Sequence, residues 1–202
     1  KSKTIAGVVV MVALLCLGWS YTSMDPTINI LPQIFQQFNP FFVIALTPVS
    51  LAVFGYLARK GKEPSAPRKI GIGMMIAVCG FLIMAIGSIG LPTPDALAAS
   101  GIEKDALVSP NWLISTYLVL TFAELFLSPM GISFVSKVAP PKYKGMMMGG
   151  WFAATAIGNY LVAIIGYLWG SMQLWMLWSV LIVCCLLAAL FIFSIMKKLE
   201  KV

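Results

Sequence analysis

Residues 112–135 read WLISTYLVLTFAELFLSPMGISFV. The stretch is long enough for a helix that crosses the hydrocarbon core of a bilayer, which needs about 20 mostly apolar residues. Its one charged side chain, Glu124, lies midway along it. A carboxylate at that depth is costly unless it is neutral or paired. The stretch therefore predicts a transmembrane helix that turns Glu124 toward a cavity or a partner, and it marks Glu124 as a functional candidate.

The composition of the whole chain extends this prediction. Hydrophobic residues make up 60% of it and charged residues 10%, whereas soluble domains are roughly a quarter charged. The net charge of +7 does not indicate a nucleic-acid site, because the basic residues form short clusters between apolar runs. We expect an integral membrane protein.

Six apolar runs are long enough to span a bilayer. They cover about residues 4–24, 32–57, 70–91, 112–135, 146–169 and 174–196. The first is read as a span and not as a cleaved signal peptide, because no small-residue cleavage site follows it. None alternates like a barrel strand, so all are expected to be helices. The predicted fold is an all-α membrane bundle of six helices.

Basic residues predict how the bundle is oriented, since short loops rich in lysine and arginine stay in the cytoplasm. Four basic clusters alternate with connections that hold only Lys104. The clusters are Lys1/Lys3, Arg59/Lys60/Lys62/Arg68/Lys69, Lys137/Lys142/Lys144 and Lys197/Lys198/Lys201. Trp112, Trp169, Trp175 and Trp178 fall near the opposite boundary, as interfacial tryptophans do. Both termini of the chain are expected in the cytoplasm.

The residues needed for most enzyme and metal sites are missing. The chain has no histidine, and its four cysteines follow no metal or redox spacing. No acidic pair lies within one apolar segment. We therefore expect no enzyme activity, no metal site and no cofactor.

Polar and small residues follow one face of the 112–135 segment at helical spacing. They are Tyr117, Thr121, Glu124, Ser128 and Gly131. Pro129 leaves the carbonyl of Leu125 without its helical donor and favours a kink. A polar face beside a kink suits a wet substrate cavity near the bilayer midplane. The alternative is a buried Glu124 that is hydrogen-bonded to a neighbouring helix.

The second span combines amides with two prolines. Asn39 precedes Pro40, and Pro48 lies in the middle of the run. This pattern predicts a broken helix against protein or a wet cavity, with Asn39 as a ligand contact. Amides in membrane helices also bridge helices, so that role stays open for Asn39.

Small residues predict close helix packing in two spans. Gly150, Ala154 and Gly158 recur every four residues in the fifth span, beside Trp151. The third span carries Gly71, Gly73, Gly80, Gly87 and Gly90. Trp151 is expected either to wall a pocket or to anchor the helix at the interface.

Together these motifs resemble the C-terminal half of the proton-dependent oligopeptide transporter (POT) family, part of the major facilitator superfamily. The resemblance runs through four segments, in the order 39–42 (NPFF), 61–65 (GKEPS), 124 with 128–131 (E, SPMG) and 147–152 (MMGGWF). It covers about residues 33–159.

The resemblance implies helices seven to twelve of a twelve-helix symporter that imports di- and tripeptides with protons across the cytoplasmic membrane. Glu124 would receive the peptide amino terminus and pair with a lysine of the N-terminal half. Asn39 would hold the peptide backbone, and Ser128 and Trp151 would line the same pocket. That N-terminal half is expected outside this chain, and no cofactor beyond the proton gradient is implied.

The first span departs from the family pattern, which has an acidic residue followed by glutamine near its outer end. Residues 19–24 read WSYTSM here. Two alternatives therefore stay open, namely a transporter of the same fold for another small solute, and a membrane scaffold subunit that transports nothing.

Overall fold

The computed structural model describes residues 32–100 and 109–200. The chain divides into two units, Lys1–Ile34 and Phe35–Val202. From Phe35 on, the described residues belong to the second unit, and the predicted span at residues 4–24 lies outside the described residues.

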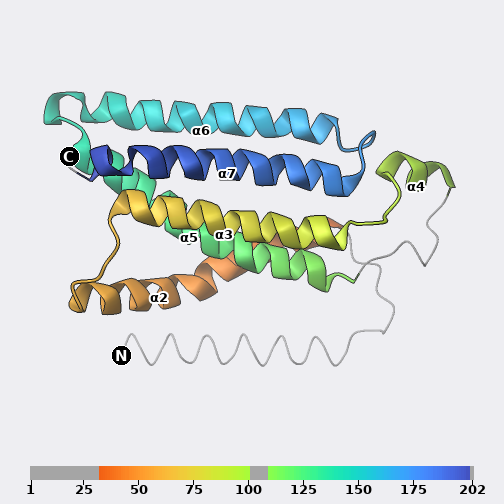
Figure 1. Cartoon of the computed structure of the whole chain (residues 1–202), viewed down its shortest axis with the longest axis horizontal. Coiled ribbons are helices and arrows are strands. Elements are labelled where there is room, and N and C mark those ends of the chain that lie inside the picture. Colours follow the sequence, from red (N-terminus) through yellow and green to blue (C-terminus); the bar gives the residue numbers. More distant parts are fainter. Residues whose placement is uncertain (1–31, 101–108, 201–202) are drawn as a thin grey trace. The chain divides into compact units, whose positions relative to one another are not determined.

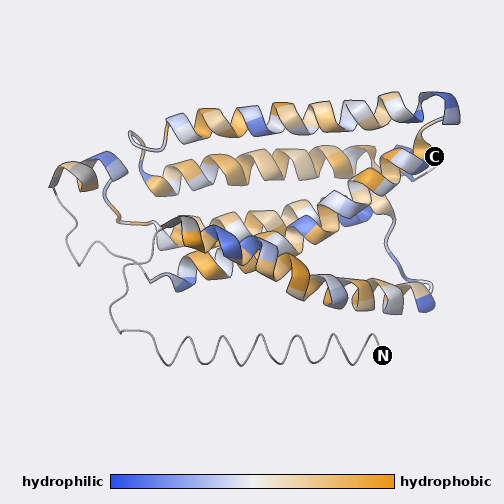
Figure 2. Cartoon of the chain, turned by 180° about the vertical axis from the view of Figure 1, so that it is seen from behind, coloured by the Kyte–Doolittle hydropathy of each residue, from blue (hydrophilic) through white to orange (hydrophobic). Residues whose placement is uncertain are grey.

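Every regular element in the described ranges is a helix. In chain order they are η1 (Pro32–Gln37), α2 (Phe38–Arg59), α3 (Ala66–Gly87), α4 (Pro94–Ser100), α5 (Asn111–Val138), η3 (Pro141–Tyr143), α6 (Lys144–Tyr167) and α7 (Leu174–Leu199). Five helices in these ranges are long and apolar enough to cross a membrane. Figure 2 shows apolar residues along the whole length of these long helices. The all-α membrane fold is confirmed for this part of the chain.

The helix ends differ from the predicted ends by a few residues. Among the spans after α2, the largest difference is in α3, which covers Ala66–Gly87 instead of residues 70–91. Pro67 fits the first turn of a helix, where its missing N–H is not needed, and the helix can therefore begin before the apolar run. Likewise, α5 and α7 each continue three residues beyond the predicted ends into basic sequence. Hydropathy marks the part inside the membrane, whereas hydrogen bonding sets the helix ends.

The predicted break in the second span takes a milder form. Residues 32–37 form a 3-10 helix, and α2 then continues without interruption through Pro48. The Thr47 hydroxyl donates to the carbonyl of Val43 at 2.5 Å. Figure 1 shows that α2 bends along its length without coming apart. The prediction of a broken helix is wrong for α2 itself, because a helix can bend around a proline while its other hydrogen bonds persist.

A glycine closes α2 and turns the chain into α3. Gly61 has a φ of 64°, a left-handed conformation that glycine adopts without a Cβ clash. The N–H of Gly61 bonds to the carbonyl of Ala58, and the N–H of Lys62 bonds to that of Leu57. These two bonds form a Schellman motif, which ends a helix by satisfying its last carbonyls. The glycine of the 61–65 motif therefore has a structural role.

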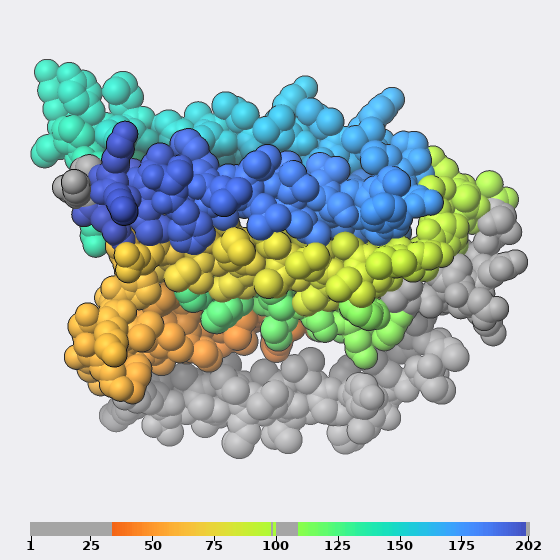
Figure 3. Space-filling model, viewed as in Figure 1, coloured from red at the N-terminus to blue at the C-terminus, as the bar shows by residue number. Residues whose placement is uncertain are grey.

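Helix α3 packs against both α5 and α7, and Figure 3 shows α3 and α7 in close contact. Its glycines make the close approach possible. A Cβ at Gly73 would lie 3.0 Å from the carbonyl oxygen of Ala123, and one at Gly80 would lie 2.7 Å from Leu120. Gly71 faces Phe193, and Gly87 faces Trp112. The predicted packing role of these four glycines is confirmed.

Ion pairs join the connections at the basic end of the bundle, where Figure 1 places the α2–α3 turn near the end of α7. Glu200 pairs with Arg68 at 3.3 Å and accepts a hydrogen bond from Ser65 at 2.6 Å. Lys69 is buried, pairs with Glu63 and lies over the ring of Phe54. These contacts join the start of α3 to the end of α7 on one side and to α2 and the α2–α3 turn on the other.

At the opposite end, α4 contacts the turn between α6 and α7. The backbone N–H of Asp95 donates to the carbonyl of Gly170 at 3.4 Å. The Asp95 carboxylate occupies the space where a side chain on Gly170 would lie. This part of the long connection after α3 therefore contacts the bundle.

The close approach at Gly73 generates a prediction. Gly73→Ala should destabilise the protein by about 1–3 kcal/mol, because the new methyl group meets the backbone of α5, which cannot move aside as a side chain end can. Gly55→Ala is the matched control, since its Cβ would meet nothing within 4 Å. Thermal unfolding of both variants in detergent checks this, and equal melting temperatures would contradict the packing account.

Candidate functional site

Glu124 lies on α5 and its side chain is exposed. No described residue forms an ion pair or hydrogen bond with it. The alternative of a buried Glu124 bonded to a neighbouring helix therefore does not hold within the described residues. Its carboxylate is open to a group outside them.

One turn before Glu124, a hydrogen bond joins α5 to α2. The hydroxyl of Thr121 donates to the side-chain oxygen of Asn39 at 3.0 Å. Thr121 is 1% exposed, whereas Asn39 is half-buried. Asn39 thus bridges two helices, as one of the two sequence-based readings expected. The sequence placed Thr121 on the polar face but did not predict this bond, because spacing within one helix does not reveal its partner on another.

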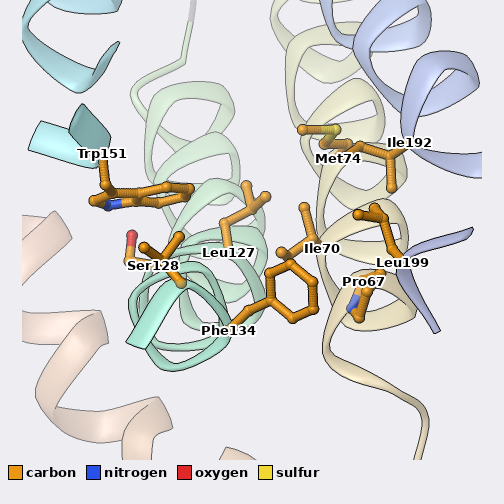
Figure 4. Close-up of a pocket in the computed structure, with 10 residues that line it drawn as sticks. Pro67, Ile70, Met74, Leu127, Ser128, Phe134, Trp151, Ile192 and Leu199 are labelled. Atoms are coloured by element: carbon orange, nitrogen blue, oxygen red, sulfur yellow. The ribbon is translucent and has the colours of Figure 1, made fainter. Parts of the chain in front are cut away.

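Ser128 and Trp151 line a cavity of about 470 Å³ between α3, α5, α6 and α7. Its other described lining residues are apolar: Pro67, Ile70, Met74, Leu127, Phe134, Val135, Ile192 and Leu199. Figure 4 shows the Trp151 indole extending from α6 across Ser128 and toward Leu127 of α5. Neither Glu124 nor Asn39 is among the described residues that line this cavity. The assignment of all four residues to one binding site stays a prediction.

Gly131 explains how the Trp151 indole reaches this position. A Cβ at Gly131 would lie 2.3 Å from Cη2 and 2.5 Å from Cζ2 of Trp151. Only a residue without a side chain leaves room for the ring against α5. Trp151 is half-buried, so the structure favours a pocket wall over an exposed interfacial anchor.

The small residues of α6 have no partner in the described part of the bundle. Gly150, Ala154 and Gly158 are exposed, and a Cβ at either glycine would meet nothing within 4 Å. No described residue of α6 beyond Met148, Trp151 and Ile165 is even half-buried. The predicted packing seam is therefore not formed within the described residues, and contact with another part of the protein stays a prediction.

The prolines of the site have different surroundings. Pro40 lies in the first turn of α2, where a missing N–H costs little. Pro129 lies inside α5, which continues through it to Val138.

Within residues 32–100 and 109–200, no cluster of histidine, cysteine or acidic side chains could hold a metal ion.

The contact at Gly131 gives a second prediction. Gly131→Ala should lower the melting temperature, because the methyl group and the Trp151 ring cannot share the same space. In a Trp151→Leu background, where the clashing ring atoms are absent, the same change should cost much less. Melting curves of the four proteins measure this coupling, and additive effects would argue against the contact.

The described residues form a helical membrane protein in which one spanning helix carries an exposed carboxylate midway along its length. A family model described as PTR2, the POT family, matches residues 15–174. The chain belongs to the POT family.

Relatives in sequence and in structure agree with this family. The chain is 37% identical over 132 residues to "Peptide transporter YePEPT" of Yersinia enterocolitica, covering 65% of this chain and 24% of that one. It is 33% identical over 134 residues to "Dipeptide and tripeptide permease B" of Xenorhabdus bovienii, covering 65% and 25%. The chain thus spans about a quarter of the length of these relatives.

Among solved structures, a peptide transporter POT in complex with sulfate superposes with a TM-score of 0.70 at 26% identity, covering 86% of this chain and 32% of that one. A POT family transporter in complex with a thioalcohol-conjugated peptide gives a TM-score of 0.58 at 27% identity, covering 81% and 31%. The helix arrangement is therefore that of part of a POT transporter.

Proposed function

We propose that this chain is the C-terminal half of a proton-coupled symporter that imports di- and tripeptides. The observation that carries the proposal is the carboxylate of Glu124, exposed midway along a membrane-spanning helix of a POT family chain. Such a group is too costly to leave in lipid, so a substrate cavity or a cationic partner must receive it. A transporter supplies both.

The N-terminal half of the same transporter is the proposed partner. The chain covers about a third of the solved POT structures that it matches, so most of a complete transporter would lie outside it. The exposed small-residue face of α6 supports this, because Gly150, Ala154 and Gly158 allow another helix to approach closely. The substrate would lie between the two halves, and one half would rock against the other around it.

The chemistry of the site suits a peptide. The carboxylate of Glu124 accepts charge-assisted hydrogen bonds, and the peptide ammonium group provides them. Asn39 is bonded to Thr121, which lies one turn before Glu124 on α5, and would offer a neutral polar contact for the peptide backbone. Ser128 and Trp151 would wall the pocket nearby, with the indole against the apolar part of the substrate. Two relatives bear names that specify peptides as their cargo.

Proton coupling would arise because the proton and the peptide ammonium group act on the same carboxylate. Removal from water favours the neutral acid, whereas a nearby cation favours the carboxylate. Proton occupancy and peptide occupancy of the site are then linked thermodynamically, and each changes the affinity for the other. No cofactor is needed beyond the proton gradient.

The orientation of the bundle follows from its charged end. The α2–α3 turn, the α5–α6 turn and the end of α7 lie at one end of the described bundle (Figure 1) and carry the basic residues. Short basic loops remain in the cytoplasm. We therefore place this end on the cytoplasmic side, with the tryptophans of α5 and α7 toward the other surface.

The test uses the full-length gene product that contains this chain, reconstituted in proteoliposomes. Glu124→Gln should abolish uptake of a labelled dipeptide driven by an inward proton gradient, because the neutral amide cannot bind the ammonium group as an anion. Glu103→Gln is the matched control, since the same change there lies in a predicted connection and should leave uptake intact. Near-normal uptake by the Glu124 variant would refute the assigned role.

Two alternatives give different outcomes in the same vesicles. A POT-type transporter for another solute would take up no dipeptide, and unlabelled dipeptides would not compete with its substrate. A scaffold would transport neither dipeptides nor another solute. Its gene would lack a second six-helix half with basic residues at membrane depth. Dipeptide uptake by the wild type excludes both.

A further inference from the structure

We infer that Thr121 is a positioning residue that orients the Asn39 amide, so that its NH2 group faces an acceptor oxygen of the ligand. The inference rests on the proposed peptide site and adds a residue to it. It starts from an unusual use of a threonine hydroxyl.

Threonines inside helices commonly bond to a carbonyl one turn earlier in their own helix. Three of the four described helical threonines do so: Thr47 donates to Val43, Thr116 to Trp112 and Thr155 to Trp151. Thr121 instead donates across to another helix, to the side-chain oxygen of Asn39 at 3.0 Å. Its hydroxyl is therefore used to hold a side chain of α2.

The direction of this bond follows from burial. Thr121 is 1% exposed, so its hydroxyl proton needs a protein acceptor. No described residue other than Asn39 accepts it, and the carbonyl of Tyr117 one turn earlier does not. The acceptor must be the oxygen of the amide, because an NH2 group has no acceptor capacity. The bond therefore distinguishes the two ends of the Asn39 amide.

With its oxygen turned toward Thr121, the amide presents its nitrogen on the other side of the group. Asn39 is half-buried, and no described residue accepts a hydrogen bond from that nitrogen. Within the described residues its two N–H donors therefore have no acceptor, and we assign them to an acceptor on a ligand. Without Thr121, no hydrogen bond from a described residue would fix which end of the amide faces the ligand.

The arrangement matches a ligand that carries a cation and an acceptor oxygen near each other. Thr121 and Glu124 lie one turn apart on α5, so the donor that Thr121 orients and the acceptor at Glu124 come from neighbouring helices. A peptide has this pairing at its amino end, where the ammonium group precedes the first carbonyl. The Asn39 NH2 group is assigned to that carbonyl oxygen.

The experiment measures dipeptide uptake by the full-length transporter at varied substrate concentration. Thr121→Val keeps the shape of the side chain but removes the donor, and it should raise KM about tenfold with Vmax changed less than about twofold. Thr121→Ser retains the hydroxyl and should restore KM to near the wild-type value. A purely structural role for this bond would lower the melting temperature and Vmax of Thr121→Val and leave KM near the wild-type value.

A double-mutant cycle and a charge variant complete the test. Thr121→Val should add nothing to the effect of Asn39→Ala, since its effect is exerted through that amide. Asn39→Asp still accepts from Thr121 but has no NH2 group, and it should bind peptide as poorly as Asn39→Ala. An unchanged KM in Thr121→Val, no rescue by serine, or additive effects would overturn the inference. A wild type that transports no dipeptide would instead overturn the proposed function on which the inference rests.

Discussion

The cost of a carboxylate at membrane depth is the constraint on which the rest of this structure depends. The residues on either side of Glu124 in α5 are phenylalanine, alanine and leucine. Its own side chain is exposed and has no ion-pair or hydrogen-bond partner among the described residues. Lipid cannot solvate it, and a folded membrane protein must provide a polar or cationic surrounding. That requirement is why we propose that the described bundle forms only one side of a site.

The bundle holds this carboxylate in place by packing that tolerates little change. Helix α3 lies close to α5 because its glycines leave no side chain between the two backbones. Helix α2 is fixed to α5 by the Thr121–Asn39 bond, one turn from Glu124. Rigid support of this kind suits a binding residue. The conformational entropy of its side chain and backbone is lost during folding, so little more is lost when the ligand binds. By contrast, α6 contributes little to the described core, which leaves its small-residue face free for another contact.

The sequence predicted the spanning helices and the close packing of α3, but it did not predict the contacts that depend on how two helices align. Apolar runs of spanning length predicted five described helices, and the glycines of α3 predicted its close packing, because both depend on local composition. The continuous path of α2 through Pro48 was missed, since the effect of a proline depends on which other bonds persist around it. Two contacts depend on the register between helices, which one sequence does not reveal. They are the hydrogen bond between Thr121 and Asn39 and the packing of the Trp151 ring against Gly131.

The most direct test is a structure of the full-length gene product with a bound dipeptide, and the quantity to measure is the distance from the peptide ammonium nitrogen to the carboxylate of Glu124. The account predicts a charge-assisted contact of about 2.7–2.9 Å, with the Asn39 side chain beside the peptide backbone. A peptide bound away from α2 and α5, or a Glu124 packed permanently against another helix with the peptide elsewhere, would contradict it.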